Sequence, residues 1–314
     1  MPVILDADDL GFEAAFSKLL DKKRGDNPFI DHAVAEIIAD VRARGDVAVL
    51  ELTQKFDRLR LKAEELQISQ NEISEQIVKV PYEERIALEL AAKRIFSYHE
   101  RQLPKDIMWQ EENGAEFGWR WTPISQAGLY VPGGLASYPS SVLMNAIPAK
   151  VAGVGRLVVT VPTPDGVINP LVLLAAKLSG VNEIYRIGGA QAVAALAYGT
   201  ESIASVDKIT GPGNAFVAAA KRQVFGKVGI DMIAGPSEIL IIADAENDPD
   251  WVALDLLSQA EHDESAQCIL ITTDAPFADA VAKAVEERMK TLTRRPIAEA
   301  SWRDFGAIIT VSSF

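Results

Sequence analysis

The sequence predicts an α/β protein in which parallel β-sheets are covered by helices, with a mainly helical N-terminal part. From residue 156 onward, short apolar runs rich in branched side chains alternate with helix-like segments. These runs are continuously apolar, as expected for strands that are buried on both faces. The length of 314 residues suggests about two domains, because domains usually hold roughly 100–200 residues each.

Helical periodicity dominates the first 120 residues. Val34, Ile38 and Val41 recur at spacings of three and four, so we expect a helix that begins after Asp31 as N-cap and ends at Gly45. The segment 82–102 has apolar residues spaced among charges and predicts a second long helix. Neither helix contains an obvious catalytic pattern.

Three strand–helix pairs follow between residues 157 and 225. The expected strands are 157–161, 183–187 and 205–209, and the expected helices are 171–178, 190–198 and 215–225. Glycines follow the second and third strands, where chains in βαβ units turn sharply into the next helix. This alternation predicts one parallel sheet with helices packed on it.

The last part of the sequence continues the same alternation. We expect strands at 239–243, 268–272 and 306–311, with a helix at 277–290. Asp248 as N-cap with Pro249 at the first helical position predicts another helix, which ends near His262. No helix follows 306–311, so we expect this strand to leave apolar surface uncovered.

Composition excludes several function classes. There are 31 Lys plus Arg and 44 Asp plus Glu, giving a net charge of −13 that repels nucleic acid and anionic membranes. The longest uncharged segment, 121–149, contains four prolines and cannot form one membrane helix. The single cysteine, Cys268, excludes a disulfide framework, and no secretory signal is visible. We therefore expect a cytoplasmic protein that acts on a small molecule.

Gln259 and His262 form the clearest polar pair. They are three residues apart in a predicted helix, so both side chains can reach one metal ion or one substrate. Imidazole is a common zinc ligand, whereas a Gln carbonyl is a weak one. The alternative is a helix C-terminus that carries a favourable histidine.

Four further residues each allow a binding role and a structural role. Asn214 follows a Gly-Pro-Gly turn and opens a helix, where it can bind a ligand or cap the helix. Gln191 lies likewise at a helix start after two glycines. Ser237 can bind a ligand or hold its turn, and Tyr130 can stack on an aromatic ligand or pack in the core. No GxGxxG motif follows any strand, so spacing alone does not indicate a dinucleotide site.

Five segments together closely resemble histidinol dehydrogenase, in order and in spacing, over essentially the whole chain. They are GLYVPGG at 128–134, GGAQAV at 188–193, TGPGNAF at 210–216, AGPSE at 234–238 and DLLSQAEH at 255–262. The resemblance implies two Rossmann-like domains and a zinc-dependent, NAD-linked enzyme of histidine biosynthesis. Such an enzyme oxidises L-histidinol through the aldehyde to L-histidine, delivering two hydrides to NAD in turn. A homodimer is also implied.

Site residues are implied position by position. Tyr130, Gln191 and Asn214 match NAD-binding positions of the family. Ser237, Gln259 and His262 match substrate-binding positions, and the last two also match zinc ligands. The expected division is a helical arm at 1–25, a first domain that joins 26–129 to 238–314 and carries the Gln259 and His262 site, and an NAD-binding domain at 130–237.

The family pattern extends beyond residue 314. Its Glu-His general base and its remaining Asp and His zinc ligands correspond to that further segment, so no catalytic base is identified in this sequence. Two hypotheses follow. The chain is a histidinol dehydrogenase, or it is an inactive truncated α/β module for ligand binding or assembly. On either hypothesis the 314-residue chain alone is expected to lack activity, because the general base and the remaining zinc ligands are missing from it.

Overall fold

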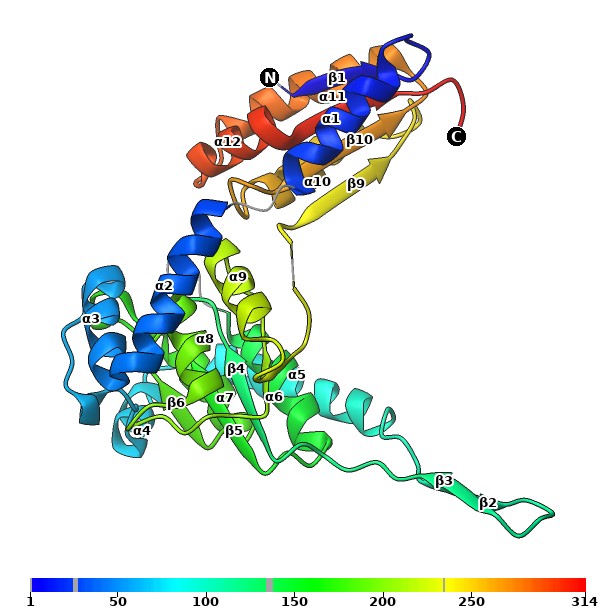
Figure 1. The fold of residues 1–314 in the computed structure, drawn as a ribbon. Coiled ribbons are helices and arrows are strands. Elements are labelled where there is room, and N and C mark those ends of the chain that lie inside the picture. The colour runs from blue at the N-terminus through cyan, green and yellow to red at the C-terminus, as the bar shows by residue number, and fades with distance from the viewer. Residues whose placement is uncertain (1, 25–27, 134–137, 234) are drawn as a thin grey trace. The chain divides into compact units, whose positions relative to one another are not determined.

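The computed structural model describes residues 2–24, 28–133, 138–233 and 235–314, which fold into two compact units. The four-stranded unit comprises Met1–Asn27 with Gly235–Phe314, and the five-stranded unit comprises Pro28–Ala234. Each unit contains a parallel sheet with helices on both faces (Figure 1). The α/β class with parallel sheets that the sequence predicts is confirmed.

All strands of the four-stranded sheet are parallel, in the order β1-β11-β10-β9. The strands are β1 (Val3–Asp6), β9 (Glu238–Ile242), β10 (Gln267–Thr272) and β11 (Gly306–Thr310). One face packs against α10 (Pro249–Ala260), α11 (Ala275–Met289) and α12 (Arg295–Phe305). The other face packs against α1 (Phe12–Arg24).

The last strand is not left uncovered, contrary to the sequence-based expectation. β11 lies between β1 and β10, and Ile308 and Ile309 are buried on opposite faces of the sheet. The cover comes from the other end of the chain, because β1 pairs with β11 and α1 packs beside it. Residues 2–24 are therefore part of this unit and not a separate helical arm; residues 1 and 25 of the expected arm lie outside the described residues.

The predicted start of α10 is confirmed. The Asp248 carboxylate accepts a hydrogen bond from the Asp250 N–H at 2.8 Å, and Pro249 occupies the first helical position. Proline has no N–H to leave unpaired there, so this position favours helix initiation. The helix ends at Ala260, which places Gln259 in its last turn and His262 in the turn that follows.

The five-stranded sheet has the order β6-β5-β4-β7-β8, again all parallel. Its strands are β4 (Gln126–Tyr130), β5 (Arg156–Thr160), β6 (Glu183–Tyr185), β7 (Lys208–Thr210) and β8 (Gly229–Ile230). One face is covered by α2 (Pro28–Arg44), α3 (Asp46–Asp57), α8 (Gly189–Tyr198) and α9 (Ala215–Val224). The opposite face is covered by α4 (Gln70–Ile77), α5 (Tyr82–Glu100), α6 (Pro139–Val151) and α7 (Pro170–Leu178). Two short 3-10 turns, η1 (Ala63–Glu65) and η2 (Pro164–Gly166), complete the unit.

The structure divides the chain differently from the expected domains. Residues 28–129 belong to the five-stranded unit, whereas the sequence analysis joined 26–129 to 238–314. The reason is the packing of α2, whose Val34 and Ile38 share a core with Val193 of α8 and Val217 of α9. Helical periodicity identifies the buried face of α2, but it does not identify the sheet that this face covers.

An antiparallel hairpin formed by β2 (Ile107–Gln110) and β3 (Glu116–Trp119) connects α5 to β4. It extends away from the five-stranded sheet (Figure 1). All eight strand residues are exposed. Among the helices described, none combines the length and the apolar character that crossing a bilayer requires.

Candidate functional site

The candidate cofactor site lies at the carboxyl ends of β4 and β7. From β4 the chain proceeds to β5 and β6 on one side of the sheet, then crosses to add β7 and β8 on the other side. The connections after β4 and β7 therefore diverge to opposite sides and leave a crevice between them. Ligands of open parallel sheets bind at this kind of switch point.

A cavity of about 350 Å³ lies beside this edge of the sheet. Its lining brings together Tyr130, Gln191 and Asn214, the three residues that the sequence analysis associated with NAD. They come from the end of β4, the first turn of α8 and the N-cap of α9. The other lining residues are Ile37, Phe56, Asp57, Gly133, Pro162, Pro164, Gly188, Gly189, Ala190 and Phe216. The volume is in the usual range for a small-molecule site.

Tyr130 is fixed in the wall of this pocket. Its side chain is buried, and its hydroxyl oxygen accepts a hydrogen bond from the Gly189 N–H at 3.0 Å. Burial raises the pKa of Tyr130 to about 12, so the phenol is neutral at physiological pH. The hydrogen bond joins the end of β4 to the start of α8 and sets the distance between these two walls of the pocket.

We predict that Tyr130→Phe lowers the free energy of unfolding by about 1–3 kcal/mol, because the Gly189 N–H loses its acceptor in a buried setting. If the pocket holds NAD, as the resemblance implies, the Michaelis constant for NAD should rise when the start of α8 loses this attachment. Urea unfolding and NAD titration measure the two effects. Tyr82→Phe, which alters an exposed tyrosine of α5, is the control and should change neither value. Unchanged stability in Tyr130→Phe would contradict the structural role.

Asn214 combines its two expected roles. Its side-chain oxygen accepts hydrogen bonds from the N–H groups of Phe216 and Val217, each at 3.1 Å, and so caps α9. With the oxygen used in the cap, the amide nitrogen is the group that Asn214 can offer to a ligand. Gly211 at the start of the same loop has φ +117°, and a Cβ there would lie 2.1 Å from the Tyr130 carbonyl oxygen. Only glycine allows this close approach.

A buried ion pair holds the same loop from behind. The Lys221 ammonium, 3% exposed, pairs with Asp231 and donates a hydrogen bond to the Gly211 carbonyl at 2.9 Å. The Asp231 carboxylate in turn accepts the Gly211 N–H at 2.9 Å. Desolvation alone raises the pKa of Asp231, but the hydrogen bonds from Lys221 and Gly211 outweigh it and hold the pKa below its ordinary value. Both polar backbone groups of Gly211 are therefore fixed.

Asp57 is a pocket residue that the sequence analysis missed. It is the last residue of α3, is 7% exposed, and its Oδ2 has no hydrogen-bond partner among the described residues. Burial raises the pKa of this carboxyl, opposed by the Thr163 backbone N–H. A buried carboxylate oxygen without a hydrogen-bond donor destabilises the folded chain unless a ligand donates a hydrogen bond to it. The sequence offers only an Asp at a helix end, with no motif around it.

Ser237, Gln259 and His262 lie in the four-stranded unit, at the edge where β9 and β10 begin. The Ser237 carbonyl accepts the Gln267 N–H at 3.0 Å, which aligns the starts of these two strands. The His262 N–H donates to the Gln259 carbonyl at 3.1 Å, and the His262 carbonyl accepts from Arg294 at 3.2 Å. Gln259 is half-buried and His262 is exposed, so the imidazole is accessible to a ligand.

A metal centre is not preformed in the described part of the chain. There, no three His, Cys, Asp or Glu side chains come together as a potential metal site. Gln259 and His262 supply an amide oxygen and an imidazole. Zinc in proteins usually has about four ligands, so these two side chains would provide about half of them. The donor chemistry at this helix end fits part of a zinc site.

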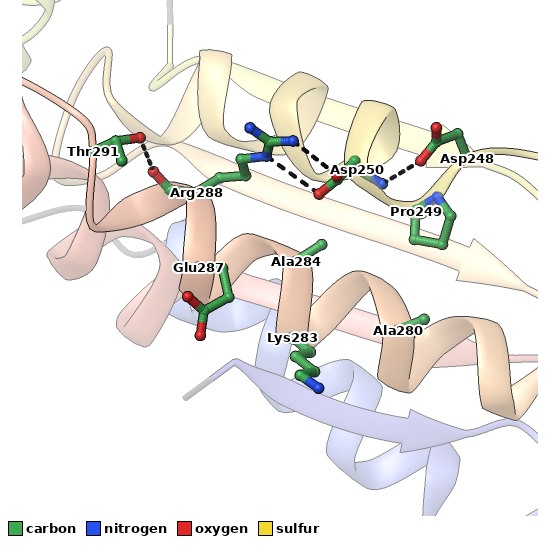
Figure 2. Close-up of a pocket in the computed structure, with 9 residues that line it drawn as sticks. All are labelled: Asp248, Pro249, Asp250, Ala280, Lys283, Ala284, Glu287, Arg288 and Thr291. Carbon is green, nitrogen blue, oxygen red and sulfur yellow. Dashed lines mark hydrogen bonds and ion pairs between the residues drawn. The ribbon is translucent and has the colours of Figure 1, made fainter.

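A larger groove, of about 580 Å³, lies elsewhere on the four-stranded unit, between α10 and α11. Figure 2 shows Arg288 directed at Asp250, with hydrogen bonds of 3.2 and 2.8 Å, while Lys283 and Glu287 point away from this pair. Asp248 is used in capping α10. The Arg288–Asp250 pair thus joins the two helices, and the groove contains none of the predicted site residues.

Comparison with known proteins identifies the family. The family model of histidinol dehydrogenase matches residues 20–314. The chain belongs to the histidinol dehydrogenase family. It is 70% identical to histidinol dehydrogenase from Ruegeria pomeroyi, over 99% of this chain and 72% of that protein. The corresponding enzyme from Cereibacter sphaeroides is 69% identical, over 98% of this chain and 71% of that protein.

A solved structure gives the same assignment. The crystal structure of histidinol dehydrogenase from Elizabethkingia anophelis superposes with a TM-score of 0.86 at 35% identity, covering 99% of this chain and 71% of that one. The resemblance inferred from the five sequence segments is confirmed, and the chain is an NAD-linked oxidoreductase of the histidinol dehydrogenase family. The comparisons do not favour the alternative of an inactive module.

Proposed function

We propose that the chain catalyses the NAD-dependent oxidation of L-histidinol to L-histidine through histidinal. The observation that carries the proposal is the meeting of Tyr130, Gln191 and Asn214 in one pocket at the switch point of a parallel sheet. These residues come from three separate sequence segments, and the chain is 70% identical to a histidinol dehydrogenase.

NAD would occupy the pocket of the five-stranded unit and accept the hydride in each of the two oxidations. Asp57 would accept hydrogen bonds from ribose hydroxyls, which supplies the partner that its Oδ2 lacks among the described residues. The same carboxylate would repel a 2′-phosphate and so favour NAD over NADP. Phe56 and Phe216, both partly exposed in the pocket lining, offer apolar surface to the cofactor.

The substrate would bind at the four-stranded unit, through Ser237, Gln259 and His262. We propose zinc as the second cofactor, held in part by Gln259 and His262, where it would orient and polarise the substrate. The weak Gln ligand suits a metal whose coordination changes when substrate enters. A cytoplasmic location and a homodimer are further parts of this proposal, in line with a biosynthetic dehydrogenase.

We predict that His262→Ala lowers zinc affinity by about 10-fold or more, because it removes one ligand from a site of about four. Metal content after dialysis against buffered zinc measures the change. His99→Ala is the matched control, because His99 lies on α5 in the other unit and its ring contacts Gln102. If His262→Ala retains as much zinc as the unmodified chain, His262 is not a zinc ligand and has only a structural role at the C-terminal end of its helix.

The proposed reaction is tested by adding L-histidinol to the chain with NAD and zinc. NADH absorbance should rise only when histidinol is present, and chromatography should recover L-histidine as product. Asn214→Ala and Gln191→Ala should raise the Michaelis constant for NAD more than that for histidinol. Histidinol-dependent NADH formation that is equal in these variants and in the unmodified chain would place the cofactor elsewhere.

A further inference from the structure

Two residues beside the candidate cofactor site have a backbone conformation that most side chains disfavour. Arg58, directly after α3, has φ +54°, and Asp165, within η2, has φ +55°. Among the residues that the structure describes, these two are the non-glycine residues with a positive φ. Glycine is the usual residue at such positions, aspartate is less frequent and arginine is uncommon. Strained backbone of this kind persists where surrounding interactions impose it, and it occurs often at ligand sites.

The two strained residues bind each other. The Arg58 Nε donates a hydrogen bond to Asp165 Oδ1 at 2.8 Å, and Nη2 donates one to Oδ2 at 2.5 Å. Two parallel bonds fix the orientation of both charged groups as well as the distance between them. A glycine at either position would relieve the strain but could not form this pair. The ion pair is therefore a physical reason for a charged side chain at each of these positions.

The pair joins two walls of the pocket. Asp57 directly precedes Arg58, Pro164 directly precedes Asp165, and both Asp57 and Pro164 line the pocket. A second contact lies beside it, because the Asp57 carboxylate accepts the Thr163 N–H. The end of α3 and the loop after β5 are thus connected by one buried contact and one exposed contact, although they are about 100 residues apart in the sequence.

The exposed contact contributes geometry more than stability. The side chains of Arg58 and Asp165 are 64% and 59% exposed. Water and salt screen charges at such positions, and exposed ion pairs generally add little to the stability of a fold. The main consequence of the two hydrogen bonds is a fixed separation between the end of α3 and the loop after β5, next to the Asp57 carboxylate.

We propose that Arg58 and Asp165 are a positioning pair for the cofactor. The pair holds the Asp57 carboxylate and the facing loop at the separation that a bound dinucleotide requires. As far as the chain is described, the lining of the pocket includes neither Arg58 nor Asp165, so the pair acts through the neighbours Asp57 and Pro164. The inference rests on the proposed NAD site and adds two residues to it.

Positioning and simple electrostatics predict different results when the pair is broken. NAD has an anionic pyrophosphate, so removal of the Asp165 charge leaves the Arg58 cation unpaired near an anionic ligand. Electrostatics alone then predicts tighter binding of NAD. Removal of Arg58 leaves the Asp165 anion and predicts weaker binding. A positioning role predicts weaker binding in both cases, because both changes remove the same contact between the two walls.

Calorimetric titration with NAD tests the proposal. Arg58→Gly and Asp165→Asn each break the pair with a residue that tolerates a positive φ. Each should raise the dissociation constant for NAD about 5-fold or more, and the double variant should bind no more weakly than the weaker single variant, because all three lose one shared interaction. Arg288→Ala is the matched control and should bind NAD normally, because it breaks an exposed two-bond pair with Asp250 on the four-stranded unit.

Two results of this titration would overturn the proposal. The first is an Asp165→Asn chain that binds NAD as tightly as the unmodified chain or more tightly. The second is a double variant in which the two single effects add, because independent effects would mean that the residues do not act as a pair.

Thermal melting and amide hydrogen exchange separate positioning from folding. All variants should melt close to the unmodified chain. The amides of Gly166 and Val167, which donate to the Thr163 and Pro164 carbonyls in the η2 turn, should exchange faster in the two pair variants and not in the control. Early melting of both single variants, or unchanged exchange at these amides, would overturn the proposal.

Failure of the positioning pair is distinct from failure of the cofactor site. If the unmodified chain does not bind NAD, the cofactor assignment is wrong and the positioning role is wrong with it. If the unmodified chain and both single variants bind NAD equally well, the cofactor assignment stands and only the role of Arg58 and Asp165 is wrong.

Discussion

Asp231→Ala should lower the free energy of unfolding by about 3–5 kcal/mol, because it leaves the Lys221 ammonium buried without its counter-charge. Lys221→Met should cost less, about 2 kcal/mol, because the Asp231 side chain that remains is 31% exposed and water can solvate it. Urea unfolding measures both, with the midpoint and slope fitted separately. Glu299→Ala, which breaks an exposed pair with Arg295, is the control and should cost under about 1 kcal/mol.

The pH dependence provides a second measurement of the same pair. The pKa of Asp231 is lowered in the folded chain, so its stabilisation is present above the ordinary value of 3.8 and is lost as the pH falls through the lower folded pKa. The unmodified chain should therefore lose stability in this acidic range, and Asp231→Ala should lose less. Parallel acid unfolding curves for the two proteins would contradict the assignment.

If the pocket binds NAD as proposed, Lys221 and Asp231 also connect stability to cofactor binding. Together they fix the N–H and the carbonyl of Gly211, three residues before Asn214 in the pocket. Loss of either side chain should then raise the Michaelis constant for NAD more than it lowers kcat, because the proposed role of the loop is to position the cofactor and not to transfer a proton. If the two variants are less stable but have an unchanged Michaelis constant for NAD, the Lys221–Asp231 pair contributes to folding only.

The parts of the fold predicted from the sequence are those fixed by short-range patterns. The strand–helix alternation places strands close to β5, β6 and β7 in one sheet, and the Asp248 and Pro249 signal begins α10 at the observed position. Pairings over long sequence distances were missed. β1 was not predicted, because its four residues form a strand only by pairing with β11 about 300 residues later.

The candidate site divides in the same way. Tyr130, Gln191 and Asn214 lie beside glycine turns, which mark them in the sequence, and the pocket brings all three together. Asp57 has no such mark, because its significance comes from burial at the end of α3 against a loop about 100 residues later. A buried carboxylate indicates a ligand site when one of its oxygens has no hydrogen-bond donor nearby. The spacing of residues in the sequence does not show which oxygens lack a donor.

Asp57→Asn should weaken NAD binding by about 10- to 100-fold, because hydrogen bonds to a charged acceptor contribute about 1.5–3 kcal/mol and an amide is a poorer acceptor for ribose hydroxyls. The ratio of the dissociation constants for NADP and NAD should decrease, because the variant no longer repels a 2′-phosphate. Calorimetric titration with both dinucleotides measures these changes. Asp279→Asn, at an exposed position on α11, is the control and should bind as the unmodified chain does.

The same substitution should raise stability in the absence of cofactor by about 1 kcal/mol, because the ionised Asp57 Oδ2 has no partner among the described residues. The pKa of Asp57 is raised on folding, so its cost is absent below the ordinary value of 3.8 and appears as the pH rises through the folded pKa. Asp57→Asn should therefore melt at a higher temperature than the unmodified chain at neutral pH, and at the same temperature in acid. If the variant binds NAD normally and is also less stable at neutral pH, the carboxylate serves the fold and not the cofactor. If Asp57 serves to bind NAD, Asp57→Asn should bind NAD more weakly and unfold less readily than the unmodified chain. The reason is that the Asp57 charge destabilises the folded chain without NAD, and the ribose hydroxyls would supply its missing hydrogen-bond donors.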